Sequence, residues 1–236
     1  MSPAPTLSVV IPIHNEASYL PGALPRLRAE LDAIGEPYEV ILAENGSTDG
    51  TDRVAADLAA AAPAIVRVLS LPEPNYGAAM RAGFRAAAGR WVVNFDIDYF
   101  SGDFLRAALA RADSADLVLA SKRAPGADDR RSRLRRLGTR GFNLLLRLLF
   151  NSRVSDTHGM KMVRRPVVEE IVPLVGSTLD LFDTELVIRA ERAGYRIAEV
   201  PVVVVELREA RSTFLSRVPR TLLGLARIRW RLWREL

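Results

Sequence analysis

The sequence predicts one α/β domain, built on a mostly parallel sheet with helices on both faces. Three observations predict it: a length of 236 residues, a composition that is 49% hydrophobic and 26% charged, and short β-rich runs that alternate with helical stretches. A chain of this length buries most of its apolar surface without a stabilising metal or disulfide. The chain has no cysteine, which excludes disulfides and thiolate metal sites.

Strands and helices can be assigned in order along the first half. Runs of apolar and β-branched residues predict strands at residues 7–13, 38–43, 66–71, 91–95 and 117–121. The spacing of apolar residues predicts helices at 16–33, 77–88 and 103–112. A further helix is predicted after the turn rich in Gly, Ser and Asp that follows the second strand, and it ends at residue 62. Ligands of such sheets bind beyond the carboxyl ends of the strands, where polar clusters occur at 14–16, 44–47 and 96–98.

Positive charge is concentrated in two segments of the second half. Residues 122–153 hold ten Lys or Arg against two Asp, residues 208–236 hold eight Arg against two Glu, and the remainder carries a net charge of −9. Arginines spaced three, four or seven residues apart predict a basic stripe beside a Leu-rich face on a helix near residue 140 and on a C-terminal helix. This pattern favours an anionic partner, although helices that pack on the sheet with a solvated basic face would also produce it.

Two classes of partner can be compared with this pattern. No run approaches the about 18 apolar residues of a spanning helix, and no secretory signal is visible, so we expect a cytoplasmic protein with peripheral contact to the cytoplasmic face of an anionic membrane. The pattern favours membrane contact for the helix near residue 140 and leaves it open for the C-terminal helix. The basic segments lack interleaved aromatic residues, so no nucleic-acid partner is expected. A homo-oligomer is compatible with the sequence.

Two carboxylates, Asp96 and Asp98, directly follow the predicted fourth strand. Carboxylate oxygens suit a hard divalent cation, and a cation at this edge would stabilise a departing diphosphate. A D-x-D pair is common and also fits a surface turn, but its position at a strand end favours the metal interpretation. Two histidines without cysteine make a zinc site improbable.

Ordered motifs give the chain a specific resemblance. Residues 8–16 (SVVIPIHNE), 44–51 (ENGSTDGT), 75–77 (NYG) and 94–98 (NFDID) resemble the GT-A glycosyltransferases of family 2. Segments of the second half resemble the polyprenyl-phosphate branch of that family, which includes dolichyl-phosphate mannose and glucose synthases. These segments are 121–123 (SKR), 135–143 (RRLGTRGFN), 156–165 (DTHGMKMVRR), 182–185 (FDTE) and 194–201 (GYRIAEVP). The resemblance extends from about residue 7 to residue 213.

The resemblance implies one GT-A domain over residues 1–236, with a nucleotide-sugar-binding half at 1–121, an acceptor-binding half at 122–213 and a basic helix at 214–236. Residues expected to bind the nucleotide sugar are Pro12, Asn15, Glu16, Glu44, Asn45, Asp49, Asn75, Asp96 and Ile97. Asp98, together with Asp96, would hold Mg²⁺ or Mn²⁺. Residues expected to bind the acceptor phosphate or the leaving diphosphate are Arg123, Arg135, Arg136 and Arg208. The catalytic set would be Asp96, Asp98, Arg123 and Arg208.

The mechanism follows from the charge of the acceptor. A phosphate monoester is anionic near neutral pH, so it can attack the anomeric carbon without a general base, and the expected reaction is an inverting hexose transfer from a GDP- or UDP-sugar to a polyprenyl phosphate. If the acceptor is instead a soluble or protein hydroxyl, a carboxylate such as Asp183 or Glu185 must accept its proton. Both acids fit equally well in the first turn of a helix, where the macrodipole favours negative charge.

Overall fold

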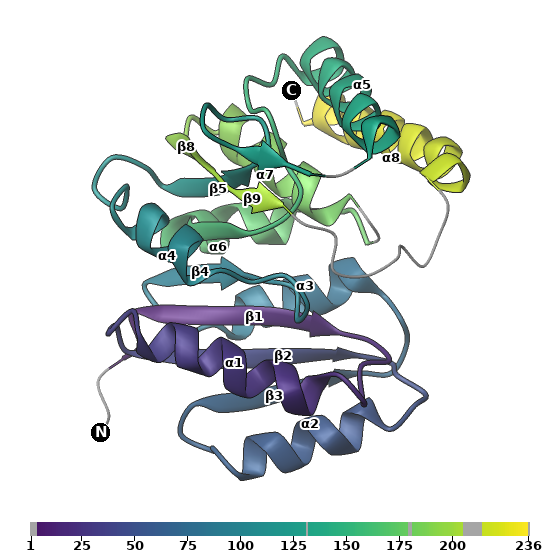
Figure 1. Cartoon of the computed structure of the whole chain (residues 1–236). Coiled ribbons are helices and arrows are strands. Elements are labelled where there is room, and N and C mark those ends of the chain that lie inside the picture. Colours follow the sequence, from purple (N-terminus) through teal and green to yellow (C-terminus); the bar gives the residue numbers. More distant parts are fainter. Residues whose placement is uncertain (1–3, 131, 179–180, 205–213, 236) are drawn as a thin grey trace.

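The computed structural model describes residues 4–130, 132–178, 181–204 and 214–235 (Figure 1). Its main sheet has the strand order β3-β2-β1-β4-β7-β5-β8, and β7 runs antiparallel to both of its neighbours. The strands are β1 (Leu7–Ile13), β2 (Tyr38–Asn45), β3 (Val66–Leu71), β4 (Trp91–Asn94), β5 (Leu117–Ser121), β7 (Lys161–Arg164) and β8 (Ile197–Pro201). A separate short ladder joins β6 (Asp128–Asp129) to β9 (Val203–Val204). The predicted mostly parallel sheet is confirmed.

Helices cover both faces of this sheet, as the alternation predicts. One face packs against α1 (Leu20–Asp32), α2 (Thr51–Ala60) and α4 (Gly102–Leu109). The other packs against α3 (Tyr76–Ala86), α6 (Arg165–Ile171) and α7 (Phe182–Arg192), with a short 3₁₀ turn, Val172–Leu174, after α6. The inner strands β2, β1, β4, β7 and β5 are buried on both sides, and the hydrophobic effect of that burial holds the three layers together.

Most predicted boundaries lie within three residues of the observed ones, but one helix begins four residues later for a clear reason. The predicted helix 16–33 begins at Leu20, because Asn15 has a φ of +55° and its side chain binds the neighbouring loop. Residues 16–19 form a turn instead, in which the backbone N–H groups of Tyr19 and Leu20 donate to the carbonyl of Glu16. Asn15, which would suit the N-cap of a helix, thus joins two loops at the edge of the sheet instead.

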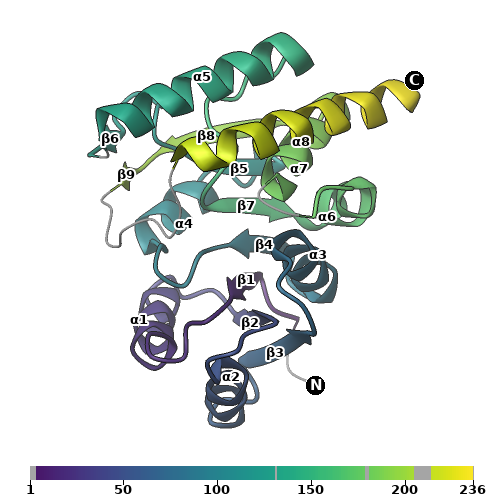
Figure 2. The same cartoon turned by 90° about the vertical axis from the view of Figure 1, so that its right-hand side faces the viewer.

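Two long amphipathic helices, α5 (Arg133–Phe150) and α8 (Phe214–Arg234), lie side by side on the outside of α7 (Figure 2). They bury a third apolar cluster between them and α7, formed mainly by Leu146, Phe150, Leu181, Ile188, Leu225, Ile228 and Leu232. Large apolar side chains nevertheless stay exposed on both helices: Leu134, Leu137, Leu144 and Leu148 on α5, and Val218, Leu222, Leu223, Trp230 and Trp233 on α8. No helix in the described ranges is long and apolar enough to cross a membrane.

Candidate active site

The strand order reverses beside β1, which has β2 on one side and β4 on the other. Ligands of open α/β sheets bind at the carboxyl ends of strands on either side of such a point. The segments that leave β1, β2 and β4 here are the motif segments around Asn15, Asn45 and Asp96. The fold therefore brings the three predicted clusters to one edge.

The loops after β1 and β2 are joined by reciprocal hydrogen bonds. The backbone N–H of Asn15 donates to Ser47 Oγ at 3.0 Å, and the N–H of Thr48 donates to Asn15 Oδ1 at 2.9 Å. The N–H of Glu16 donates to Thr51 Oγ1 at 2.8 Å. These bonds hold the two loops in one orientation, so the edge is formed before any ligand arrives.

Asp49 completes this connection with both of its oxygens. Its Oδ1 accepts from the N–H and hydroxyl of Thr51, at 3.0 and 2.5 Å, and its Oδ2 accepts from the N–H of Ala17 at 3.1 Å. The hydrogen bond from the Thr51 hydroxyl is the main cause that lowers the pKa of Asp49. The structure thus shows Asp49 shaping the loops around the predicted nucleotide pocket.

A third segment joins the same frame through Asn45 and Asn75. The buried Asn45 accepts from the N–H of Asn75 at 2.5 Å, and Asn75 in turn caps α3 by accepting from the N–H of Ala78 at 3.0 Å. Glu44, also buried, accepts from the N–H of Ser47 at 2.6 Å. Pro12 lies in β1, half-buried, just before this edge.

The D-x-D segment forms a tight turn immediately after β4. Asp96 and Tyr99 exchange two backbone hydrogen bonds, with N···O distances of 3.0 and 3.3 Å. Ile97 is 3% exposed and packs into the core beneath the turn. Its buried side chain anchors the turn, and the acids on either side of it stay more accessible: Asp96 is exposed and Asp98 is half-buried. Asp98 also lines a cavity of about 350 Å³.

Negative charge is concentrated at this turn. Desolvation, followed by repulsion from Asp183 and Asp98, raises the pKa of Asp96 to about 6. Asp96 is exposed, and the carboxylates of Asp183 and Asp98 lie near enough to repel its charge. Repulsion that favours a bound proton also favours a bound cation, so the surroundings of Asp96 and Asp98 suit a divalent metal.

The donor set agrees with that interpretation. Among the described residues no group of three or more Asp, Glu or His side chains is arranged to hold a metal. Mg²⁺ in nucleotide-dependent enzymes is commonly held by one or two carboxylates, with phosphate oxygens and water completing its shell. Asp96 and Asp98 supply two carboxylates next to the predicted nucleotide edge, which fits this arrangement.

A buried ion pair lies close to the D-x-D turn. The Lys161 side chain is fully buried, and its ammonium donates to Asn94 Oδ1 at 2.9 Å, to the Gly159 carbonyl at 2.8 Å and to Asp183 Oδ1 at 2.8 Å. Tyr76 donates its hydroxyl to the other oxygen of Asp183 at 2.7 Å. All three ammonium protons therefore have acceptors. Sequence analysis missed Lys161, although a lysine between Met160 and Met162 is a signal of an inward-facing charge.

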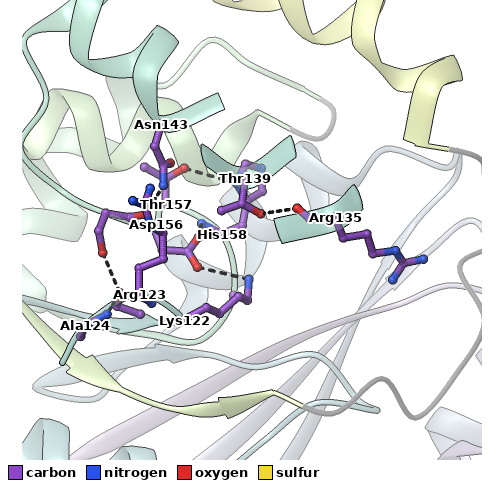
Figure 3. Close-up of polar contacts among 12 residues, drawn as sticks. Lys122, Arg123, Ala124, Arg135, Thr139, Asn143, Asp156, Thr157 and His158 are labelled. Carbon is purple, nitrogen blue, oxygen red and sulfur yellow. Dashed lines mark hydrogen bonds and ion pairs between the residues drawn. The ribbon is translucent and has the colours of Figure 1, made fainter. Parts of the chain in front are cut away.

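A second pair, Lys122 with Asp156, stands at the end of β5 with an N···O distance of 3.3 Å (Figure 3). Asp156 also accepts from the backbone N–H of His158 at 3.1 Å. The His158 ring packs edge-on against Phe142, with centroids 5.3 Å apart, and burial lowers its pKa. Lys122 is the basic side chain at this end of β5, and Asp156 balances its charge.

The three predicted phosphate-binding arginines that the structure describes, Arg123, Arg135 and Arg136, do not gather around this pair. Arg123 is exposed on a turn in which Ser121 Oγ accepts the N–H groups of residues 123 and 124. Arg135 points away from Lys122 and Asp156 in Figure 3, and Arg136 is exposed on α5. Arg208 lies outside the described residues. Arg123 is thus closest in sequence to the site, next to Lys122.

The two candidate bases are both held by other groups. Asp183 and Glu185 lie in the first turn of α7, as expected from the macrodipole. Asp183 has a donor on each oxygen, as described above. Glu185 is fully buried and accepts from Arg189 at 2.9 Å, from Arg231 at 2.7 Å and from the Ser177 N–H at 2.8 Å. Burial alone would raise the pKa of Glu185, but these hydrogen bonds outweigh it and lower the pKa.

An open α/β sheet with bonded loops at its switch point and a carboxylate turn beside them agrees with the GT-A resemblance of the sequence. The comparison with known families agrees: residues 8–172 match the family described as "Glycosyl transferase family 2". The chain belongs to that family and is a glycosyltransferase.

Two curated proteins are similar to this chain over parts of their length. Glycosyltransferase AglD of Haloferax volcanii is 33% identical over 202 residues, which cover 83% of this chain and 32% of AglD. An undecaprenyl-phosphate 4-deoxy-4-formamido-L-arabinose transferase of Aeromonas hydrophila is 44% identical over 94 residues, covering 39% of this chain and 28% of that protein. The chain thus spans about a third of the length of these relatives.

A solved structure supports the fold. The mannosyltransferase PcManGT of Pyrobaculum calidifontis, in complex with GDP-Man and Mn²⁺, is 25% identical and superposes with a TM-score of 0.64. The match covers 93% of this chain and 61% of PcManGT. The recognised resemblance to GT-A family 2 enzymes, and to their polyprenyl-phosphate branch, is therefore confirmed.

Proposed function

We propose that the protein transfers a hexose from a GDP- or UDP-sugar to a polyprenyl phosphate, with inversion at the anomeric carbon and with Mg²⁺ or Mn²⁺ bound. The PcManGT structure contains GDP-Man and Mn²⁺, and the name of the Aeromonas relative includes undecaprenyl phosphate. The donor half would be residues 1–121 and the acceptor half 122–213, with the basic helix 214–236 beside them.

On the donor side, the frame built around Asn15, Asp49 and Asn75 would hold the nucleotide. Asp96 and Asp98 would hold the divalent cation, which neutralises the diphosphate and makes it a better leaving group. The loops are already bonded to each other, so little of the binding energy is used in ordering them.

On the acceptor side, Arg123 would hold the phosphate that attacks, with Lys122 next to it and Arg135, Arg136 and Arg208 as further candidates. A guanidinium offers two parallel N–H donors to phosphate oxygens. One acceptor oxygen forms the new bond to the anomeric carbon as the bond to the diphosphate breaks, and the electron pair leaves with the nucleoside diphosphate. No proton has to be removed from the acceptor.

The observation that carries this proposal is that the carboxylates of Asp183 and Glu185 are buried and paired with other side chains. A hydroxyl acceptor needs a carboxylate that it can reach and that can take its proton, and Asp183 and Glu185 are both buried. Asp183 is paired with Lys161 and Tyr76, and Glu185 with Arg189 and Arg231. Neither is arranged as a base, which favours an acceptor that is already anionic.

The direct test is a screen of GDP- and UDP-sugars with a short polyprenyl phosphate in the presence of Mn²⁺ or Mg²⁺. Formation of a glycosyl polyprenyl phosphate is expected. Turnover with a soluble or protein hydroxyl and none with the polyprenyl phosphate would overturn the acceptor assignment.

Arg123→Ala should raise the KM for the polyprenyl phosphate about tenfold, because a charge-assisted hydrogen bond contributes about 1.5–3 kcal/mol. The KM for the nucleotide sugar should change less than about twofold. Arg130→Ala, which removes another exposed arginine of the same segment, is the matched control. A larger change in the donor KM than in the acceptor KM would place Arg123 on the donor side.

Peripheral membrane contact through α5 and α8 is part of the proposal. Trp230 and Trp233 are 55% and 65% exposed and lie among arginines, an arrangement suited to the headgroup region. The double change Trp230→Ser and Trp233→Ser should lower the fraction that floats with phosphatidylglycerol-rich vesicles. Leu174→Ser, at an exposed apolar position outside α5 and α8, should not. An equal loss of flotation in both variants, or no flotation of the unchanged protein, would contradict the proposed membrane contact.

A further inference from the structure

A small cavity between α8 and the loop at residues 176–178 has no role in the proposed function. It measures about 100 Å³ and is lined by Gly176, Ser177, Thr178, Leu181, Arg220, Thr221, Gly224, Arg227 and Arg231. None of these residues belongs to the nucleotide or acceptor sets above, and none is acidic. Three arginines and three hydroxyl side chains around one cavity form a lining of donors and positive charge.

The geometry of α8 produces this arrangement. Residues 220, 224, 227 and 231 follow one another at spacings of four and three, so they lie on one face of the helix. Gly224 lets α8 approach the N-terminal end of α7, because a Cβ at Gly224 would overlap the side chain of Leu181. Gly176 does the same from the other side, since a Cβ there would lie 2.9 Å from Cζ of Arg231. Two glycines thus allow the close approach that forms the cavity.

Arg231 is held in place by two hydrogen bonds of its guanidinium group, and its Nε–H has no acceptor among the described residues. Its Nη2 donates to Glu185 Oε2 at 2.7 Å and to Ser177 Oγ at 3.1 Å. Its Nε is buried and finds no hydrogen-bond acceptor in the described part of the chain. Buried donors are normally satisfied, so an unsatisfied one in the lining of a cavity points to a ligand or water there.

Charge indicates what kind of ligand. Arg189 and Arg231 are paired with Glu185 and Glu235, and these four residues are neutral as a set. Arg220 and Arg227 line the cavity together with Arg231, and no carboxylate is among the lining residues. A phosphate group carries up to two negative charges near neutral pH and accepts several hydrogen bonds from guanidinium and hydroxyl groups.

The volume of the cavity limits the size of the ligand. The cavity volume of about 100 Å³ exceeds the about 10–15 Å³ that a single water needs. That suits a compact oxyanion and is well below the about 300 Å³ at which pockets for larger organic ligands begin. We propose that this cavity is a second phosphate-binding site, separate from the acceptor site, which takes the phosphate group of a lipid or of a small soluble molecule.

The test measures binding of inorganic phosphate by calorimetry without metal, in the Arg123→Ala background so that the proposed acceptor site contributes less. Arg227→Gln should weaken the affinity about tenfold, as expected for loss of one charge-assisted hydrogen bond. Arg229→Gln is the matched control, because Arg229 lies on the same helix but lines the groove beside Trp230. It should leave the affinity within about twofold. Equal affinities in the two variants, or no binding before the substitutions, would overturn the proposal.

Flotation with phosphatidylcholine vesicles that contain phosphatidic acid identifies the source of the phosphate. Both variants lose one positive charge, so general attraction to the vesicle falls equally in each. A larger loss for Arg227→Gln than for Arg229→Gln indicates a lipid phosphate. Equal flotation together with the calorimetric difference indicates a soluble phosphate. The binding readouts do not depend on sugar transfer, so the site can fail while the proposed function stands, and the reverse.

Discussion

Asp98→Asn should lower kcat/KM for hexose transfer by about 10²–10³, with little effect on folding. Loss of one preorganised group that stabilises charge in the transition state typically costs this much. Asp98 is half-buried on a turn that is held by the backbone bonds of Asp96 and by the buried side chain of Ile97, and neither of these contacts involves the Asp98 carboxylate. The change removes charge while the amide keeps the size of the side chain.

The measurement is steady-state turnover at several Mn²⁺ concentrations. The variant should need more metal to reach its residual rate, because one carboxylate ligand has become a neutral amide. Asp103→Asn is the matched control, since Asp103 is an exposed carboxylate on α4 that pairs with Arg106. A variant at position 98 with unchanged rate and metal dependence would contradict the metal assignment.

The sequence predicts the part of the site whose residues directly follow predicted strands. Asp96 and Asp98 follow a buried strand, and in a parallel sheet such segments meet at one edge, so their position follows from the alternation alone. The loops around Asn15 and Asn45 were placed at that edge for the same reason. The start of α1 was predicted wrongly, since the side chain of Asn15 binds a loop that is distant in sequence.

The ion pairs of the site could not be predicted in this way. Lys161 meets Asp183, 22 residues later, because β7 enters the sheet antiparallel between β4 and β5. No spacing rule relates a lysine on such a strand to the first turn of a helix. Glu185 could equally have been a base, and only its contacts with Arg189 and Arg231 show that it joins α7 to α8.

Lys161→Met should be the most destabilising single change near the site, at about 3–5 kcal/mol in the free energy of unfolding. Lys161 is fully buried, and removal of its ammonium leaves the Asp183 carboxylate without its ion-pair partner and Asn94 Oδ1 without its donor. A buried charge without a partner is costly, whereas replacement of the whole pair by apolar residues is often close to neutral. Equilibrium unfolding in urea measures the loss.

The double variant Lys161→Met with Asp183→Leu separates the two explanations for that loss. If the cost arises from the stranded charge of Asp183, the double variant should recover a large part of it. The remainder would reflect the unsatisfied groups of Asn94 and Tyr76, at about 1–3 kcal/mol for each buried group. If the cost arises from the loss of packing around the lysine stem, the double variant should be no more stable than the single one. A Lys161→Met variant that loses less than about 1 kcal/mol would show that the pair does not hold β7 to α7.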